Sequence, residues 1–67
     1  MLDAKMKELI AIGASVACNC HPCIKFHTGK ANEMNVESEL TKQAVEVGKM
    51  VRNGAANQMD ELLEKNF

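Results

Sequence analysis

The stretch that most constrains the fold of this chain is residues 9–20, which contain no charged side chain. Apolar residues recur there at helical spacing, and the residues between them are small. A helix that is apolar or small on every side is expected to be buried on every side. Twelve residues are too few to cross a bilayer, for which about 18 apolar residues are needed. We therefore predict a core helix over residues 3–18, shared between subunits.

A second helix is predicted over residues 21–33. Pro22 is tolerated only in the first turn of a helix, and Asn19 is a competent N-cap just ahead of it. Asn35 suits the left-handed position that follows a helix C-terminus. These residues indicate a short helix that is preceded and followed by non-helical residues.

A third helix is predicted to start at Glu37 or Ser38. Its apolar positions form a continuous stripe at helical spacing: Leu40, Ala44, Val47, Gly48, Val51 and Ala55. The dipeptide Asn53-Gly54 is interpreted as a kink or an end, with residues 55–65 continuing in helical register. No segment of useful length alternates like a strand. The predicted fold class is all-α, a small helical domain of three helices, or of four if Asn53-Gly54 breaks the last.

The composition indicates one domain, residues 1–67, whose apolar surface is covered by further copies of the same chain. A chain of 67 residues buries only ~60% of its unfolded surface, yet 46% of its residues are apolar, which favours a homo-oligomer. The net charge is −1 without a basic tract, so neither nucleic acid nor a membrane is an expected partner. The first residues include Asp3 and Lys5 rather than a secretory apolar segment. The expected compartment is therefore the reducing cytoplasm.

The reactive part of the sequence is Cys20-His-Pro-Cys23. In the first turn of a helix, two cysteines at this spacing can close a disulfide without moving the backbone, and the helix N-terminus favours a thiolate. A thioredoxin-like dithiol normally belongs to a βαβ unit, which is missing here. The pair therefore belongs to an all-helical redox protein or to a metal site. The alternative is that both cysteines are small buried hydrophobes.

His27 follows Cys23 by one helical turn and shares its face. A neutral imidazole there can take the thiol proton or pass one to a peroxide leaving group. Glu8 is the only acid among residues 4–32 and flanks the uncharged stretch. Taken alone, Glu8 is interpreted as a solvated carboxylate.

Cys18 adds a third thiol close to this motif. It is interpreted as a spectator at the end of the first helix. Cys18, Cys20, Cys23 and His27 nevertheless have the donor types that hold zinc or a thiophilic metal. Structural zinc sites usually draw their ligands from two separated pairs, so no metal is assigned. The basic residues of the third helix are interpreted as a solvated face: Lys42, Lys49 and Arg52. The alternative is that Lys49 or Arg52 pairs across a subunit interface.

The spacing of Glu8, Cys20, Cys23 and His27 resembles the signature of the alkylhydroperoxidase D-like branch of the carboxymuconolactone decarboxylase family. The segments on both sides are similar to that family as well: 8–17 and 44–55. The four-residue signature is fairly specific for the dithiol branch, whereas the flanking helices are specific only for the fold. The resemblance covers nearly the whole chain and implies an all-helical fold that assembles into trimers or hexamers.

The resemblance also implies a role for each residue of the signature. Cys23 corresponds to the cysteine that attacks hydroperoxide and becomes a sulfenic acid. Cys20 corresponds to the cysteine that protonates the leaving group and then resolves the sulfenic acid as a disulfide. Glu8 and His27 correspond to the carboxylate–imidazole pair that relays protons. The implied activity is a thiol-dependent, antioxidant peroxidase that needs no bound cofactor and is reset by an external dithiol.

Two features differ from that branch. Pro22 stands where the alkylhydroperoxidase has a histidine, and this chain has a histidine one place earlier, at His21. The chain is also far shorter than the two-repeat hydroperoxidase, so the substrate pocket is expected largely between subunits. We predict a thiol–disulfide oxidoreductase that acts on hydroperoxides or disulfides. The alternatives are a metal-binding module and a non-enzymatic helical assembly unit.

Overall fold

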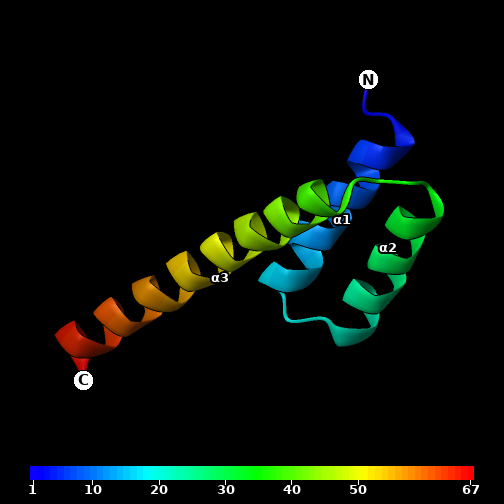
Figure 1. The fold of residues 1–67 in the computed structure, drawn as a ribbon. Helices are drawn as coiled ribbons and strands as arrows, with labels where there is room; N and C mark the ends of the chain where they lie inside the picture. The colour runs from blue at the N-terminus through cyan, green and yellow to red at the C-terminus, as the bar shows by residue number, and fades with distance from the viewer.

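A computed structural model describes residues 1–67 and contains three α-helices and no strand (Figure 1). α1 spans Ala4–Ala17, α2 spans His21–Glu33 and α3 spans Ser38–Asn66. α1 packs against both other helices: α2 runs back beside it, and α3 crosses it before extending away from the rest of the molecule. The predicted all-α fold is confirmed in its three-helix form.

Asn19 is not the N-cap of α2, as its position in the sequence suggested, but the residue that ends α1. Its φ of 56° lies in the left-handed region, which asparagine tolerates better than most residues. The N–H groups of Asn19 and Cys20 donate to the carbonyl groups of Val16 and Ser15, which closes the end of α1 in Schellman geometry. Cys20 then serves as the N-cap of α2.

Asn35 ends α2 in the same way. Its φ is 59°, and the N–H of Val36 donates to the carbonyl oxygen of Ala31 at 3.0 Å. This turn directs the side chain of Val36 into the core, where it is 8% exposed. The predicted left-handed Asn35 and the start of the third helix at Ser38 are both confirmed.

α3 continues without a break through Asn53-Gly54, so the kink or end predicted there is wrong. A glycine in a helix interior costs about 1 kcal/mol relative to alanine but keeps its backbone N–H, and no proline follows it. Every residue of 53–67 is exposed, and this half of α3 projects beyond the other two helices (Figure 1).

The core of the single chain is small, and its buried apolar residues are Ile12, Ala31 and Val36. α1 and α3 come closest where Gly48 meets Gly13. A Cβ atom on Gly48 would lie 2.5 Å from the carbonyl oxygen of Gly13. Only glycine therefore fits at position 48, and its lack of a side chain sets how closely the two helices pack.

α1 is not buried on every side within one chain, and its burial between subunits, predicted from its uncharged stretch, stays a prediction. Ile10 is 54% exposed. It borders a groove of about 540 Å³ between α1 and α3, called here the α1/α3 groove. Residues of the predicted apolar stripe of α3 form the opposite wall, among them Leu40, Val47 and Val51. No helix of the structure combines the length and the apolar character that a membrane span requires.

Candidate dithiol site

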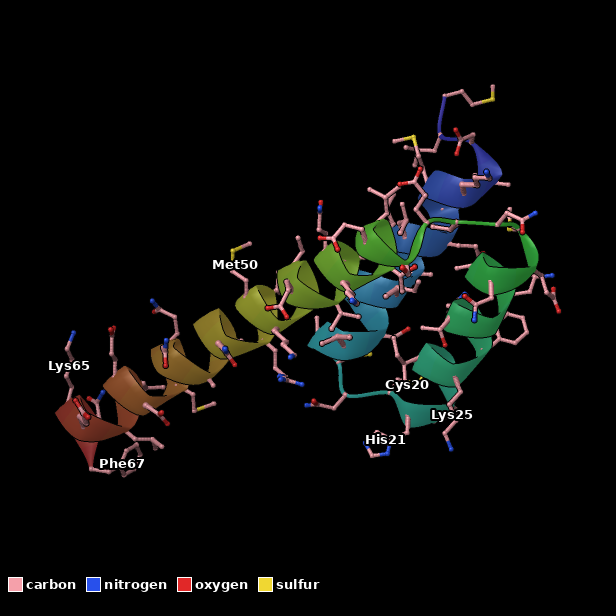
Figure 2. The ribbon with its side chains drawn as sticks, in the orientation of Figure 1. Cys20, His21, Lys25, Met50, Lys65 and Phe67 are labelled. Carbon is pink, nitrogen blue, oxygen red and sulfur yellow. A yellow bond between two sulfur atoms is a disulfide. The ribbon has the colours of Figure 1, made fainter.

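The candidate site lies where α1 gives way to α2. Cys20 and Cys23 form a disulfide there, with Cα atoms 5.2 Å apart, inside the usual range for such a bridge. Cys20 precedes the first turn of α2 and Cys23 lies within it, so the bridge sits at the N-terminus of that helix (Figure 2). Neither cysteine is fully buried. The interpretation of the pair as small buried hydrophobes is therefore wrong.

The sulfur atom of Cys20 takes the position that a capping oxygen normally occupies. The backbone N–H of Cys23 donates to Cys20 Sγ at 3.3 Å. The N-terminal N–H groups of α2 have no partner within the helix, and together they form the positive end of its dipole. Negative charge on Cys20 is therefore stabilised whenever the disulfide is opened.

Glu8 and His27 meet across the interface of α1 and α2. Glu8 Oε1 lies 2.8 Å from His27 Nδ1, and the two side chains are 18% and 28% exposed. Glu8 is therefore not the solvated carboxylate that its position alone suggested. An ionised carboxylate accepts a hydrogen bond from the Nδ1–H group and leaves Nε2 of the imidazole free to take up or release a proton.

His27 also has a fixed place on α2. It lies one turn beyond Cys23, so both side chains start from the same face of the helix. The ring of Phe26 packs edge-to-face on the imidazole, with centroids 5.1 Å apart and planes at 84°. Phe26 covers one side of His27 while remaining 61% exposed itself. The imidazole is thus held by a carboxylate and by an aromatic edge.

A pocket of about 240 Å³ opens beside Cys20 and is called here the Cys20 pocket. It is lined by Ser15, Val16, Asn19, Cys20, His21, Ile24, Val45, Lys49 and Arg52. Arg52 Nη1 donates to Asn19 Oδ1 at 3.1 Å, which ties α3 to the turn between α1 and α2. Cys23 does not line this pocket. The two sulfur atoms of the bridge therefore have different surroundings.

Sequence reasoning missed Lys49 and Arg52 as residues of the site. Both are interpreted from the sequence as part of a solvated face, and the structure places both at the Cys20 pocket, where Lys49 is exposed and Arg52 is half-buried. Their spacing of three residues indicates a shared face of α3. Nothing in the sequence shows that this face meets Asn19 and His21, because that meeting depends on how α3 crosses α1.

Cys18 lies at the C-cap of α1 with an exposed, free thiol. Its Sγ is 3.7 Å from the carbonyl oxygen of Ser15. No three side chains of His, Cys, Asp or Glu lie close enough together to hold a metal ion. The four-ligand set considered for Cys18, Cys20, Cys23 and His27 is therefore not assembled in this structure.

Comparison with protein families supplies an independent observation. Residues 1–62 match the model described as Carboxymuconolactone decarboxylase family. The matched residues include every side chain of the site described above. The comparisons with curated proteins and with solved structures returned no match.

Proposed function

The chain belongs to the carboxymuconolactone decarboxylase family, and we propose that it is a thiol–disulfide oxidoreductase of the alkylhydroperoxidase D-like kind that reduces hydroperoxides. The observation that carries the proposal is the Cys20–Cys23 disulfide at the N-terminus of α2, with His27 one turn further along that helix and paired to Glu8 of α1. A decarboxylase reaction would leave this cysteine pair without a role. The site therefore favours the redox activity within the family.

In the proposed oxidative half-reaction, the Cys23 thiolate attacks one oxygen of the hydroperoxide. The O–O bond breaks, Cys23 becomes a sulfenic acid, and the departing alkoxide takes the proton of the Cys20 thiol to become an alcohol. The Cys20 thiolate then attacks the sulfenic sulfur, and the hydroxide that leaves is protonated to water. The two thiols together supply the two electrons that reduce the peroxide.

Glu8 and His27 are proposed to handle the protons of this half-reaction. Cys23 must lose a proton to become a nucleophile, and the hydroxide expelled from the sulfenic acid must gain one to become water. The imidazole of His27 shares a helix face with Cys23 and has Nε2 free for both transfers. Glu8 is a positioning residue that holds the tautomer and stabilises the imidazolium while the proton is carried.

An external dithiol is proposed to reset the enzyme. It reduces the disulfide by thiol–disulfide exchange, and the cycle needs no bound cofactor. Such a supply of reductant is typical of a reducing compartment, which is why we propose the cytoplasm as the location.

Self-assembly is proposed as well, in the form of trimers or hexamers. Large apolar side chains stay exposed along α1 and on both halves of α3, among them Ile10, Val47, Met59, Leu62 and Leu63. The projecting half of α3 has no surface of its own chain to cover it, and the α1/α3 groove is apolar and open. A second copy of the chain buries both the projecting half of α3 and the α1/α3 groove, because it carries the same two apolar surfaces.

The test of the proposed activity is a thiol count on the reduced chain. One equivalent of an organic hydroperoxide should remove two thiols, form the Cys20–Cys23 bridge and yield one equivalent of alcohol. Adding a dithiol should then make peroxide consumption catalytic. A folded chain whose thiol count and peroxide level stay unchanged would refute the proposal. Stoichiometric bound metal would then favour the metal-binding module, and metal-free protein the assembly unit.

A further inference from the structure

We propose that the Cys20 pocket selects the reductant by charge, and that it takes a small thiol or dithiol carrying a carboxylate. The inference rests on the proposed function, because it names the chemical class of the external reductant that resets the disulfide. It also assigns a role to Asn19, Lys49 and Arg52, which the oxidative half-reaction does not use.

The position of the pocket identifies the sulfur that the reductant meets. Cys20 lines the Cys20 pocket and Cys23 does not. Glu8 and His27 are likewise outside its lining. A molecule bound in this pocket is therefore next to Cys20, on a different side of the disulfide from the groups that handle the peroxide.

The charge of the pocket favours an anion. Its lining contains the cations Lys49 and Arg52 and no acidic residue. Arg52 makes no ion pair, and only one of its N–H donors is engaged, by the neutral oxygen of Asn19. Lys49 is 3.7 Å from Glu46 in an exposed pair, so its charge is partly balanced. Arg52 is consequently the main anchor for a carboxylate, with a fork that can bind both oxygens.

The size and the remaining walls of the pocket favour a small molecule. A volume of about 240 Å³ lies below the range of 300–1,000 Å³ typical of pockets for drug-sized ligands. Val16, Ile24 and Val45 supply apolar surface for a short hydrocarbon chain between the sulfur and the carboxylate of the ligand. Arg52 is held toward Asn19, the neighbour of Cys20 in the chain, so anion and thiol ends can be bound together.

The exchange proceeds in two balanced steps. The thiolate of the reductant attacks Cys20 Sγ, the Cys20–Cys23 bond breaks, and the sulfur of Cys23 leaves and takes up a proton. A second thiolate attacks the sulfur of the reductant in the mixed disulfide and expels Cys20, whose charge is stabilised by the N–H of Cys23. Two thiols are oxidised to one disulfide, and two electrons and two protons reach the protein.

The experiment compares three thiols of similar length on the oxidised chain, without peroxide: 3-mercaptopropionate, 2-mercaptoethanol and cysteamine. Reduction rates are divided by the concentration of each thiolate, since the three thiols ionise differently. On the unmodified chain, 3-mercaptopropionate should be about 10-fold faster than 2-mercaptoethanol, the size expected for one charge-assisted contact, and cysteamine should be slowest. Equal rates for the three thiols would overturn the proposal before any variant is made.

Matched variants locate the effect. Arg52→Gln should lower the ratio of the 3-mercaptopropionate rate to the 2-mercaptoethanol rate from about 10 to about 1, since the fork that binds the carboxylate is lost. Lys42→Gln removes one positive charge from an exposed position of the same helix outside the pocket, and should leave the preference intact. Equal losses in both variants would overturn the proposal, since they would indicate a general effect of net charge. A chain that keeps the preference but consumes no peroxide would refute the peroxidase instead.

Discussion

Glu8 Oε1 lies 2.8 Å from His27 Nδ1 and so joins the first half of α1 to the middle of α2. The pair connects residues 19 positions apart in the chain. His27 lies on the same face of α2 as Cys23, while the sulfur of Cys20 caps the first turn of that helix. Each cysteine therefore has its own neighbours, and each half of the proposed cycle has its own groups.

Glu8→Gln is expected to lower peroxide turnover by roughly tenfold, a loss of about 1.4 kcal/mol of transition-state stabilisation. The amide can still meet His27 but carries no charge to stabilise an imidazolium. The measurement is the rate of peroxide consumption across pH, with thermal melting to verify the fold. Glu33→Gln, at an exposed position of α2, is the matched control and should leave both unchanged. An unaltered pH–rate profile in Glu8→Gln would remove Glu8 from the mechanism.

Cys23→Ser is expected to abolish turnover, because the proposed nucleophile is lost. Cys20→Ser should still allow one attack on peroxide, leaving a sulfenic acid at Cys23 that a trapping reagent can label. Mass spectrometry of the labelled chain identifies the modified residue. Cys18→Ser serves as the control and should keep both the bridge and the turnover. A label on Cys20 in the Cys23→Ser variant, with turnover retained, would reverse the assigned roles.

Gly48→Ala is expected to destabilise the fold by about 1–3 kcal/mol, because the added Cβ would meet the backbone of α1. It would lie 2.5 Å from the oxygen of Gly13 and 2.7 Å from Cβ of Val16. Gly54→Ala is the matched control, since nothing lies within 4 Å of its Cβ position. It should stabilise α3 by about 0.5–1 kcal/mol. Denaturant unfolding of the two variants measures the difference, and equal stabilities would show that α1 and α3 are not closely packed at Gly48.

Val47→Glu and Leu62→Glu are expected to shift the proposed assembly toward smaller species. Both place a charge on an exposed apolar surface, one in the α1/α3 groove and one on the projecting half of α3. Light scattering after size separation measures the mass in solution. Gln58→Glu adds the same charge at another exposed position of α3 and should leave the mass unchanged. A monomeric unmodified chain at all concentrations would contradict the assembly.

Much of the fold could be predicted because its signals are local. Pro22 and Asn35 delimit α2 through backbone preferences that act within one turn. Asn19 was assigned to the wrong cap because asparagine suits both an N-cap and a left-handed C-terminal position, and only the path of the chain decides between them. Asn53-Gly54 predicts a kink or an end, yet α3 is one continuous helix through both residues.

Part of the candidate site could likewise be predicted from local sequence, and part depends on contacts between residues far apart in the chain. Cys20, Cys23 and His27 share one segment, so their relation follows from helical spacing alone. The involvement of Glu8 was implied only by the family resemblance, because no spacing rule spans the turn between α1 and α2. The contact between Arg52 and Asn19 could not be predicted from local spacing, because the two residues are 33 positions apart in the chain.

The sequence by itself determined that a cysteine pair opens a helix and that the fold is all-α, because caps and periodicity act over one or two turns. The tertiary structure alone decided which distant groups reach that pair. Gly48 lets α3 pack closely on α1, and this crossing brings Lys49 and Arg52 to Cys20. The packing of α2 on α1 in turn brings His27 to Glu8. Such contacts depend on how whole helices pack against one another, and no short stretch of the sequence specifies that packing.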